Sequence, residues 1–281
     1  METRIEQALI DGGLRRSPGF PDASLAQQMC ERWAGSREGK EPLPEALFAQ
    51  PLGRNHAAIV RTQACGCRVL AVPLTLYRAL EGDLFALDAA FPPDWGAKEL
   101  PALEWTTGPL PPRTVRDLER VLNTTADRSA TLLGGVQALL DGGRIVFERP
   151  VPDPGLIRDL WALLPGSTRA ETWPATFVPS NGLGFHVAVA ASAAGPDYSD
   201  YVREEGAAEY PEGRYELALQ SAVESGDQEE VDRLLSRRSR TQVLWLAVIL
   251  LLLFTLAAMM AALARPVEGD AQKPTATKKE K

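Results

Sequence analysis

Apolar residues recur at intervals of three and four positions in several stretches of the chain, a spacing that predicts amphipathic helices. One such helix is expected over residues 24–33. The same spacing, with turn residues at the ends, predicts further helices at 74–80, 114–122, 129–140, 155–164, 215–225 and 228–239. Asp153 followed by Pro154 is typical of a helix start, and Asp227 with Glu230 has the spacing of a capping box.

Short apolar runs between turn residues predict β-strands. These runs lie at residues 56–60, 68–72, 144–147, 172–178 and 183–190. The last two runs are separated by a turn that contains Asn181-Gly182, which is a strong signal for a β-hairpin. Because helices and strands are expected in both halves, the pattern favours an α+β fold.

Prolines concentrate between residues 91 and 112, where the chain carries six of them. Proline removes a backbone donor and disfavours regular structure, so a boundary is expected there. The predicted organisation is an N-terminal α+β subdomain (1–105), a Pro-rich linker (106–112), a second α+β subdomain with the hairpin (113–195), an acidic linker with juxtamembrane helices (196–241), a transmembrane helix (242–264) and a disordered tail (265–281).

The transmembrane prediction comes from the most apolar stretch, residues 243–264. It contains no charged side chain and a single hydroxyl, Thr255. A helix of this length would reach roughly 33 Å, enough to cross a hydrocarbon core of about 30 Å. The first residues hold no apolar export signal, and arginines precede the span, so we expect a single-pass protein with a cytoplasmic N-terminal domain and its short tail on the far side.

The net charge of the chain limits the classes of partner that it is expected to bind. The chain carries 37 acidic and 30 basic side chains, and most of its few lysines lie after residue 264. An acidic domain of this kind argues against nucleic-acid binding, which needs basic surfaces. The acidic stretch 197–212, with its tyrosines, is expected to be a solvated linker or a protein contact surface.

Only a few residues could carry catalysis or bind a metal. Cys30, Cys65 and Cys67 could hold a metal or form a redox pair, but their spacing is better explained by a turn between two strands. His56 and His186 lie in apolar runs, where a histidine is usually structural. The sequence therefore predicts no catalytic, metal-binding or cofactor-binding residue.

Glycine pairs at 134–135 and 142–143 flank a predicted helix without matching a phosphate-binding loop. Before the apolar span the only lysines are Lys40 and Lys98, and neither lies in a glycine-rich loop. Nucleotide binding through such a loop is thus disfavoured.

Several short stretches resemble bacterial GTPase-associated proteins, in particular their N-terminal and middle domains. They are SPGF (17–20), PLG (51–53), LLGGVQALLDGGRIVFER (132–149), WPATF (173–177) and YPEGRYELALQ (210–220). The resemblance covers most of residues 1–235 and implies an adaptor whose partner is a GTPase in a bacterial signalling or conflict system.

Together these observations predict a membrane-anchored cytoplasmic interaction protein, non-catalytic, with a protein partner and a lipid bilayer contacted through residues 243–264. The alternative is a membrane-tethered hydrolase that uses His56 or His186.

Overall fold

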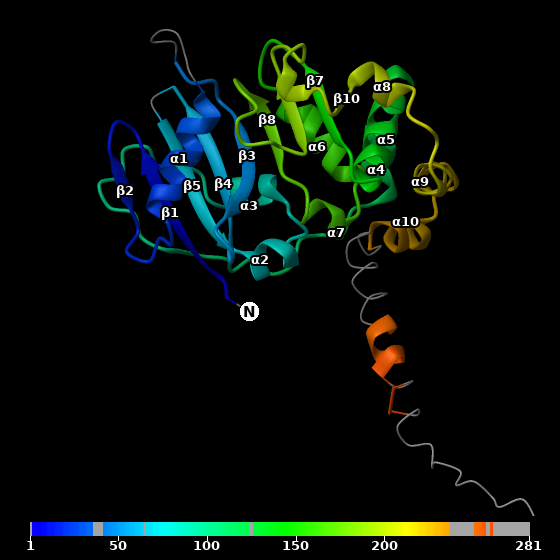
Figure 1. Cartoon of the computed structure of the whole chain (residues 1–281), viewed down its shortest axis with the longest axis horizontal. Helices are drawn as coiled ribbons and strands as arrows, with labels where there is room; N and C mark the ends of the chain where they lie inside the picture. Colours follow the sequence, from blue (N-terminus) through cyan, green and yellow to red (C-terminus); the bar gives the residue numbers. More distant parts are fainter. Residues whose placement is uncertain are drawn as a thin grey trace, which may run out of the picture. The chain divides into compact units, whose positions relative to one another are not determined.

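The computed structural model describes residues 2–35, 42–64, 66–123, 126–236, 250–256 and 259–260. The chain divides into two compact units, Met1–Ser239 and Arg240–Lys281. The first unit holds a large sheet with helices around it (Figure 1).

Ten strands form the sheet, in the order β10-β7-β9-β8-β3-β4-β5-β1-β2, with β6 paired to β1. In chain order the strands are β1 (Arg4–Ile10), β2 (Leu14–Arg16), β3 (Leu47–Leu52), β4 (His56–Gln63), β5 (Gly66–Pro73), β6 (Leu103–Glu104), β7 (Arg144–Glu148), β8 (Pro174–Val178), β9 (Val187–Ala190) and β10 (Tyr201–Arg203).

The sheet has an antiparallel half and a parallel half. Strands β3, β4, β5, β1 and β2 run antiparallel to their neighbours, whereas β8, β9, β7 and β10 run parallel. The halves meet where β3 pairs antiparallel with β8 through Phe48 and Ala175. Every residue of β5 is buried, so helices or loops cover both faces of the sheet there.

The helices pack against both halves (Figure 1). They are α1 (Ala23–Ala34), α2 (Leu74–Ala79), α3 (Leu84–Ala90), α4 (Val115–Leu122), α5 (Ala126–Leu140), α6 (Pro154–Leu163), α7 (Gly166–Arg169), α8 (Glu204–Ala208), α9 (Arg214–Ser225) and α10 (Gln228–Leu235), with a 3₁₀ turn η1 (Pro196–Tyr198). Trp33 of α1 stacks on Phe48 of β3 and donates its indole N–H to the carbonyl of Phe177 in β8, which fixes α1 across the junction of the halves.

Helix starts follow the local signals. Asp153 caps α6 by accepting from the backbone N–H of Leu156, as the Asp-Pro pair predicts. Asp227 caps α10 in the same way, by accepting from the N–H of Glu230. The Glu230 carboxylate instead binds Arg233, three residues further on. The structure therefore confirms the cap at Asp227 but shows no bond from the Glu230 side chain back to the backbone N–H of Asp227.

The predicted hairpin around Asn181-Gly182 is wrong. Strands β8 and β9 are neighbours but run parallel, so residues 179–186 carry the chain back to the start of β8. Asn181 is buried, and its amide donates to the carbonyl of Asp197 at 3.0 Å and to the hydroxyl of Tyr201 at 2.9 Å. These distant contacts override the local turn preference of the Asn-Gly pair.

The predicted fold class, α+β with a single C-terminal transmembrane helix, is also wrong. The first unit is a mixed α/β fold, because helices alternate with parallel strands from β7 onward. Among the residues that the structure describes, no helix is long and apolar enough to cross a membrane.

The same finding corrects the predicted localisation, which depends on a membrane helix at 242–264. Within that span, positions 250–256 and 259–260 are described as helical, with exposed leucine, phenylalanine and methionine side chains. The rest of the span and the predicted tail, 265–281, lie outside the described residues.

The expected boundaries inside the first unit stay a prediction. Strands from both sides of residues 106–112 belong to the one sheet. The acidic stretch 197–212 contributes β10, which pairs with β7, and the short helix α8.

Candidate functional site

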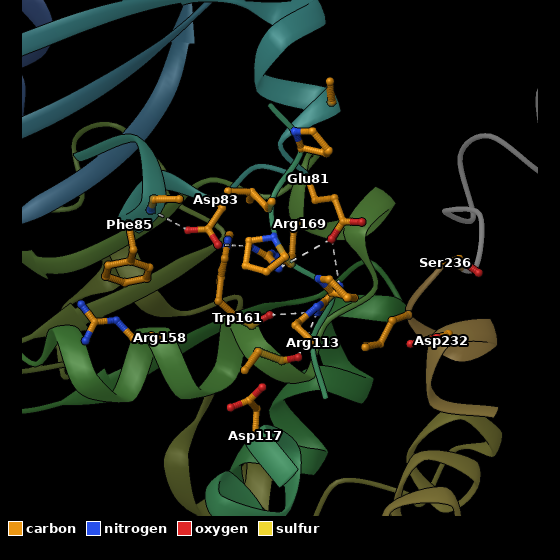
Figure 2. Close-up of a pocket in the computed structure, with 18 of the residues that line it drawn as sticks. Glu81, Asp83, Phe85, Arg113, Asp117, Arg158, Trp161, Arg169, Asp232 and Ser236 are labelled. Carbon is orange, nitrogen blue, oxygen red and sulfur yellow. Dashed lines mark hydrogen bonds and ion pairs between the residues drawn. The ribbon is translucent and has the colours of Figure 1, made fainter. Parts of the chain in front are cut away.

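A cavity of about 730 Å³ opens on the first unit, between helices and loops that adjoin the antiparallel and the parallel halves of the sheet (Figure 2). This α3–α6 cavity is lined by the loop before α3, by α3 itself, by the proline-rich residues 109–112, by α6 and by the end of α10. Its volume lies within the range of about 300–1,000 Å³ that is usual for ligand pockets.

The loop Glu81-Gly82-Asp83 brings two carboxylates to the cavity. Glu81 and Gly82 both have left-handed backbone conformations, with φ of 51° and 65°. A side chain at Gly82 would lie 2.6 Å from the carbonyl oxygen of Arg169, so only glycine fits. The carbonyl of Gly82 accepts a 3.0 Å bond from the indole N–H of Trp161. The loop is therefore held against α6 and α7, and this contact stabilises the unfavourable backbone of Glu81.

Arg169, at the end of α7, is buried and binds both carboxylates. Its guanidinium lies 2.7 Å from Asp83 Oδ2 and 3.8 Å from Glu81 Oε2. Gly166 makes room for the Glu81 carboxyl group, because a Cβ there would lie 2.4 Å from Glu81 Cδ. Asp83 also caps α3 by accepting from the N–H of Ala86. The carboxylates thus have fixed positions before any ligand arrives.

Arg113, directly after the proline-rich stretch, is the second cation of the cavity, and its side chain is largely buried. It donates to Glu81 Oε2 at 3.0 Å and to the carbonyl of Ala162 at 2.9 Å, near the end of α6. Burial, together with the nearby charge of Arg169, lowers the pKa of Arg113 to about 10, so the group is still protonated at neutral pH. Arg113 therefore joins the chain before α4 to α6 and to the Glu81 loop.

The outer wall of the cavity is apolar with charged groups at its ends. Phe85 of α3 carries the guanidinium of Arg158 over its ring, 4.8 Å from the centroid. In Figure 2, Phe85 and Arg158 lie on one side of the buried arginines, and Asp232 lies on the other. Asp117 of α4 also faces the cavity.

Most charged groups in the α3–α6 cavity are paired with one another. Its buried arginines and their carboxylates neutralise one another, and none of these pairs is a nucleophile with an adjacent general base. Among the described residues, no group of three or more His, Cys, Asp or Glu side chains is arranged to hold a metal ion.

Neither histidine lines the cavity. His186 precedes β9, and its Nδ1 accepts a 3.0 Å bond from the backbone N–H of Trp173. Trp173 in turn stacks on the buried ring of Tyr77. His56 is the first residue of β4 and pairs with Leu52 of β3. The hypothesis of a hydrolase that uses either histidine stays a prediction.

Stability is expected to depend on pH through His186. Burial, and then the charge of Arg144, lower the pKa of His186 below its usual value of 6.5, so the folded state binds its proton less readily than the unfolded state. As pH falls below 6.5, protonation of the unfolded chain lowers the free energy of unfolding. We expect His186→Gln to lose less stability than the wild type between about pH 8 and pH 5 in urea titrations. Equal losses would show that His186 does not titrate with unfolding.

Two of the cysteines lie together in the core. Cys30 of α1 and Cys67 of β5 are both buried. The hydrogen bond with the Cys67 thiol, together with burial, raises the pKa of the Cys30 thiol, which disfavours its reactive thiolate. Cys65 lies outside the described residues, so the predicted Cys65–Cys67 turn is not seen in full.

Comparison with known proteins identifies no relative of the chain. No family model and no curated protein matches it. The resemblance to bacterial GTPase-associated proteins therefore stays a prediction.

The sequence prediction did not identify the residues of this cavity. Glu81, Arg113 and Arg169 belong to no motif, and the structure brings them together from three separate loops and helix ends. The Glu-Gly-Asp turn after a helix was the one local signal available, since a glycine there allows a left-handed backbone.

Proposed function

We propose that this protein is a non-catalytic binding module that recognises a segment of a protein partner in the α3–α6 cavity. The observation that carries the proposal is the combination of apolar walls with buried charges that are already paired. Phe85, Leu110 and Trp161 supply apolar surface, while Arg113 and Arg169 are bound by carboxylates. A site of this kind can bind and position a ligand through its apolar walls.

A protein segment fits the cavity better than a compact metabolite. The cavity is bordered by the exposed prolines 109, 111 and 112 and by the exposed residues Asp232 and Ser236, so its mouth extends along the surface. Aromatic side chains in partly enclosed pockets are typical anchors of protein contacts. The partner class to test first is a GTPase, which the sequence resemblance implies.

The proposal predicts that Phe85 is an anchor for binding. Peptides would be selected on the full chain from a phage-displayed random library, and their dissociation constants measured by fluorescence polarisation. Phe85→Ala is expected to weaken the selected peptides about tenfold, because a buried phenylalanine contributes roughly 1.5–3 kcal/mol of apolar contact. Ala89→Trp, which fills the mouth beside Phe85, is expected to weaken them as well.

The matched control is Leu217→Ala on α9, which removes an exposed apolar side chain outside the cavity. It should leave every dissociation constant unchanged. Binding that is equally strong in Phe85→Ala, Ala89→Trp and Leu217→Ala would place the peptide site elsewhere and overturn the proposal.

A further inference from the structure

The charges that a ligand can reach in the α3–α6 cavity are mostly negative. The side chains of Glu81 and Asp117 are 47% and 50% exposed, and Asp232 is exposed as well. By contrast, the side chains of Arg113 and Arg169 are 15% and 4% exposed. The lining residues include nearly equal numbers of acidic and basic side chains. Most of the exposed ones, however, are acidic.

An anionic ligand would have to displace existing bonds. Arg113 already donates to Glu81 and to the carbonyls of Ala162 and Leu164, and Arg169 is paired with Asp83. Removing a carboxylate from a buried arginine is costly. The buried cations therefore contribute little attraction for an incoming anion.

The exposed cation of the site is Arg158. It lies over the ring of Phe85, on the opposite side of the buried arginines from Asp232 (Figure 2). Hydrogen bonds from Thr114 lower the pKa of Asp117, so this carboxylate is charged at neutral pH. The aromatic ring and its cation thus lie on one side of the buried arginines and the exposed carboxylate of Asp232 on the other, while Asp117 lies between these two sides (Figure 2).

We infer that the occupant of the α3–α6 cavity is a peptide segment that presents an arginine or lysine to the exposed carboxylate of Asp117 or Asp232, with apolar neighbours against Phe85 and the proline-rich wall. This inference rests on the proposed function, because it names the chemistry of the partner for the same cavity. Electrostatic complementarity of this kind sets specificity and makes binding sensitive to salt.

The test uses a positional-scanning library of synthetic peptides with blocked termini, bound to the full chain. Pools with arginine or lysine fixed at one position are expected to bind about tenfold more tightly than pools with glutamate or leucine fixed there. Raising NaCl from about 0.05 M to 0.5 M should remove most of this preference, because it screens exposed charges.

The variant Asp117→Asn/Asp232→Asn should also lose the preference, since asparagine keeps an acceptor oxygen but not the charge. Glu205→Gln/Glu209→Gln, with two exposed carboxylates of the α8 region that do not line the cavity, is the control and should keep it.

The outcomes separate this inference from the proposed function. Loss of the basic preference in the aspartate variant alone supports the inference. Phe85-dependent binding without a basic preference, or with an acidic one, overturns the inference and leaves the proposed function standing. If no pool binds in a Phe85-dependent way, both are overturned.

Discussion

Replacing Asp83 with alanine is expected to lower the free energy of unfolding by about 3 kcal/mol or more, because it leaves the buried guanidinium of Arg169 without its closest carboxylate. Glu81, at 3.8 Å, compensates only in part. The change also removes the cap of α3, which contributes about 1 kcal/mol on its own. Guanidinium chloride titrations of the full chain, followed by tryptophan fluorescence, would measure the loss.

Two variants separate the ion pair from the cap. Asp22→Ala removes the exposed cap of α1 without touching an ion pair and should cost only about 1 kcal/mol. Asp83→Asn keeps an oxygen for the cap but loses the charge, so it should remain nearly as unstable as Asp83→Ala. If Asp83→Asn costs no more than Asp22→Ala, the pair with Arg169 contributes nothing to stability.

A double variant extends the same argument. Asp83→Ala/Arg169→Met removes both charges, and we expect it to be more stable than Asp83→Ala alone, because no buried cation is left unpaired. The rigid ion pairs would then be retained for the shape of the α3–α6 cavity more than for net stability.

Helix starts could be predicted because their determinants are local. The cap at Asp153 joins side chain and backbone within one turn, so the Asp-Pro pair was sufficient. Strand β1 could not be predicted in this way. Its polar residues Glu6 and Gln7 are buried, and Gln7 is satisfied by the distant carbonyl of Pro101 and by Arg68, which hides the apolar pattern of a core strand.

The residues of the cavity could not be predicted for the same reason, because the residues that bind one another there are far apart in the sequence. Glu81 bonds to Arg113 across 32 residues of sequence, and nothing near either residue indicates the other. The parallel pairing of β8 and β9 is likewise decided by contacts such as Asn181 with Tyr201, and the Asn-Gly pair alone predicted a hairpin. Hydropathy alone likewise predicted a membrane helix that no described helix supports.

Replacing Gly134 with alanine is expected to destabilise the first unit by about 2–3 kcal/mol, although alanine favours a helix interior by about 1 kcal/mol. Gly134 lies within α5, and a Cβ there would lie 1.9 Å from the carbonyl oxygen of Ala207 in α8. Because that atom belongs to the backbone, α8 must move as a whole, which strains the adjoining pair of β10 with β7. Thermal unfolding followed by circular dichroism would measure the change.

The matched control is Gly206→Ala in α8 itself. Its Cβ would lie 3.7 Å from Val202 Cγ1, an ordinary contact, so the same substitution should be neutral or stabilise by up to about 1 kcal/mol. Opposite signs for the two variants would show that close backbone contact between α5 and α8, rather than helix propensity, determines the effect. Stabilisation by both variants would mean that α8 does not pack as closely on α5 in solution, and that β10 joins the sheet without its support.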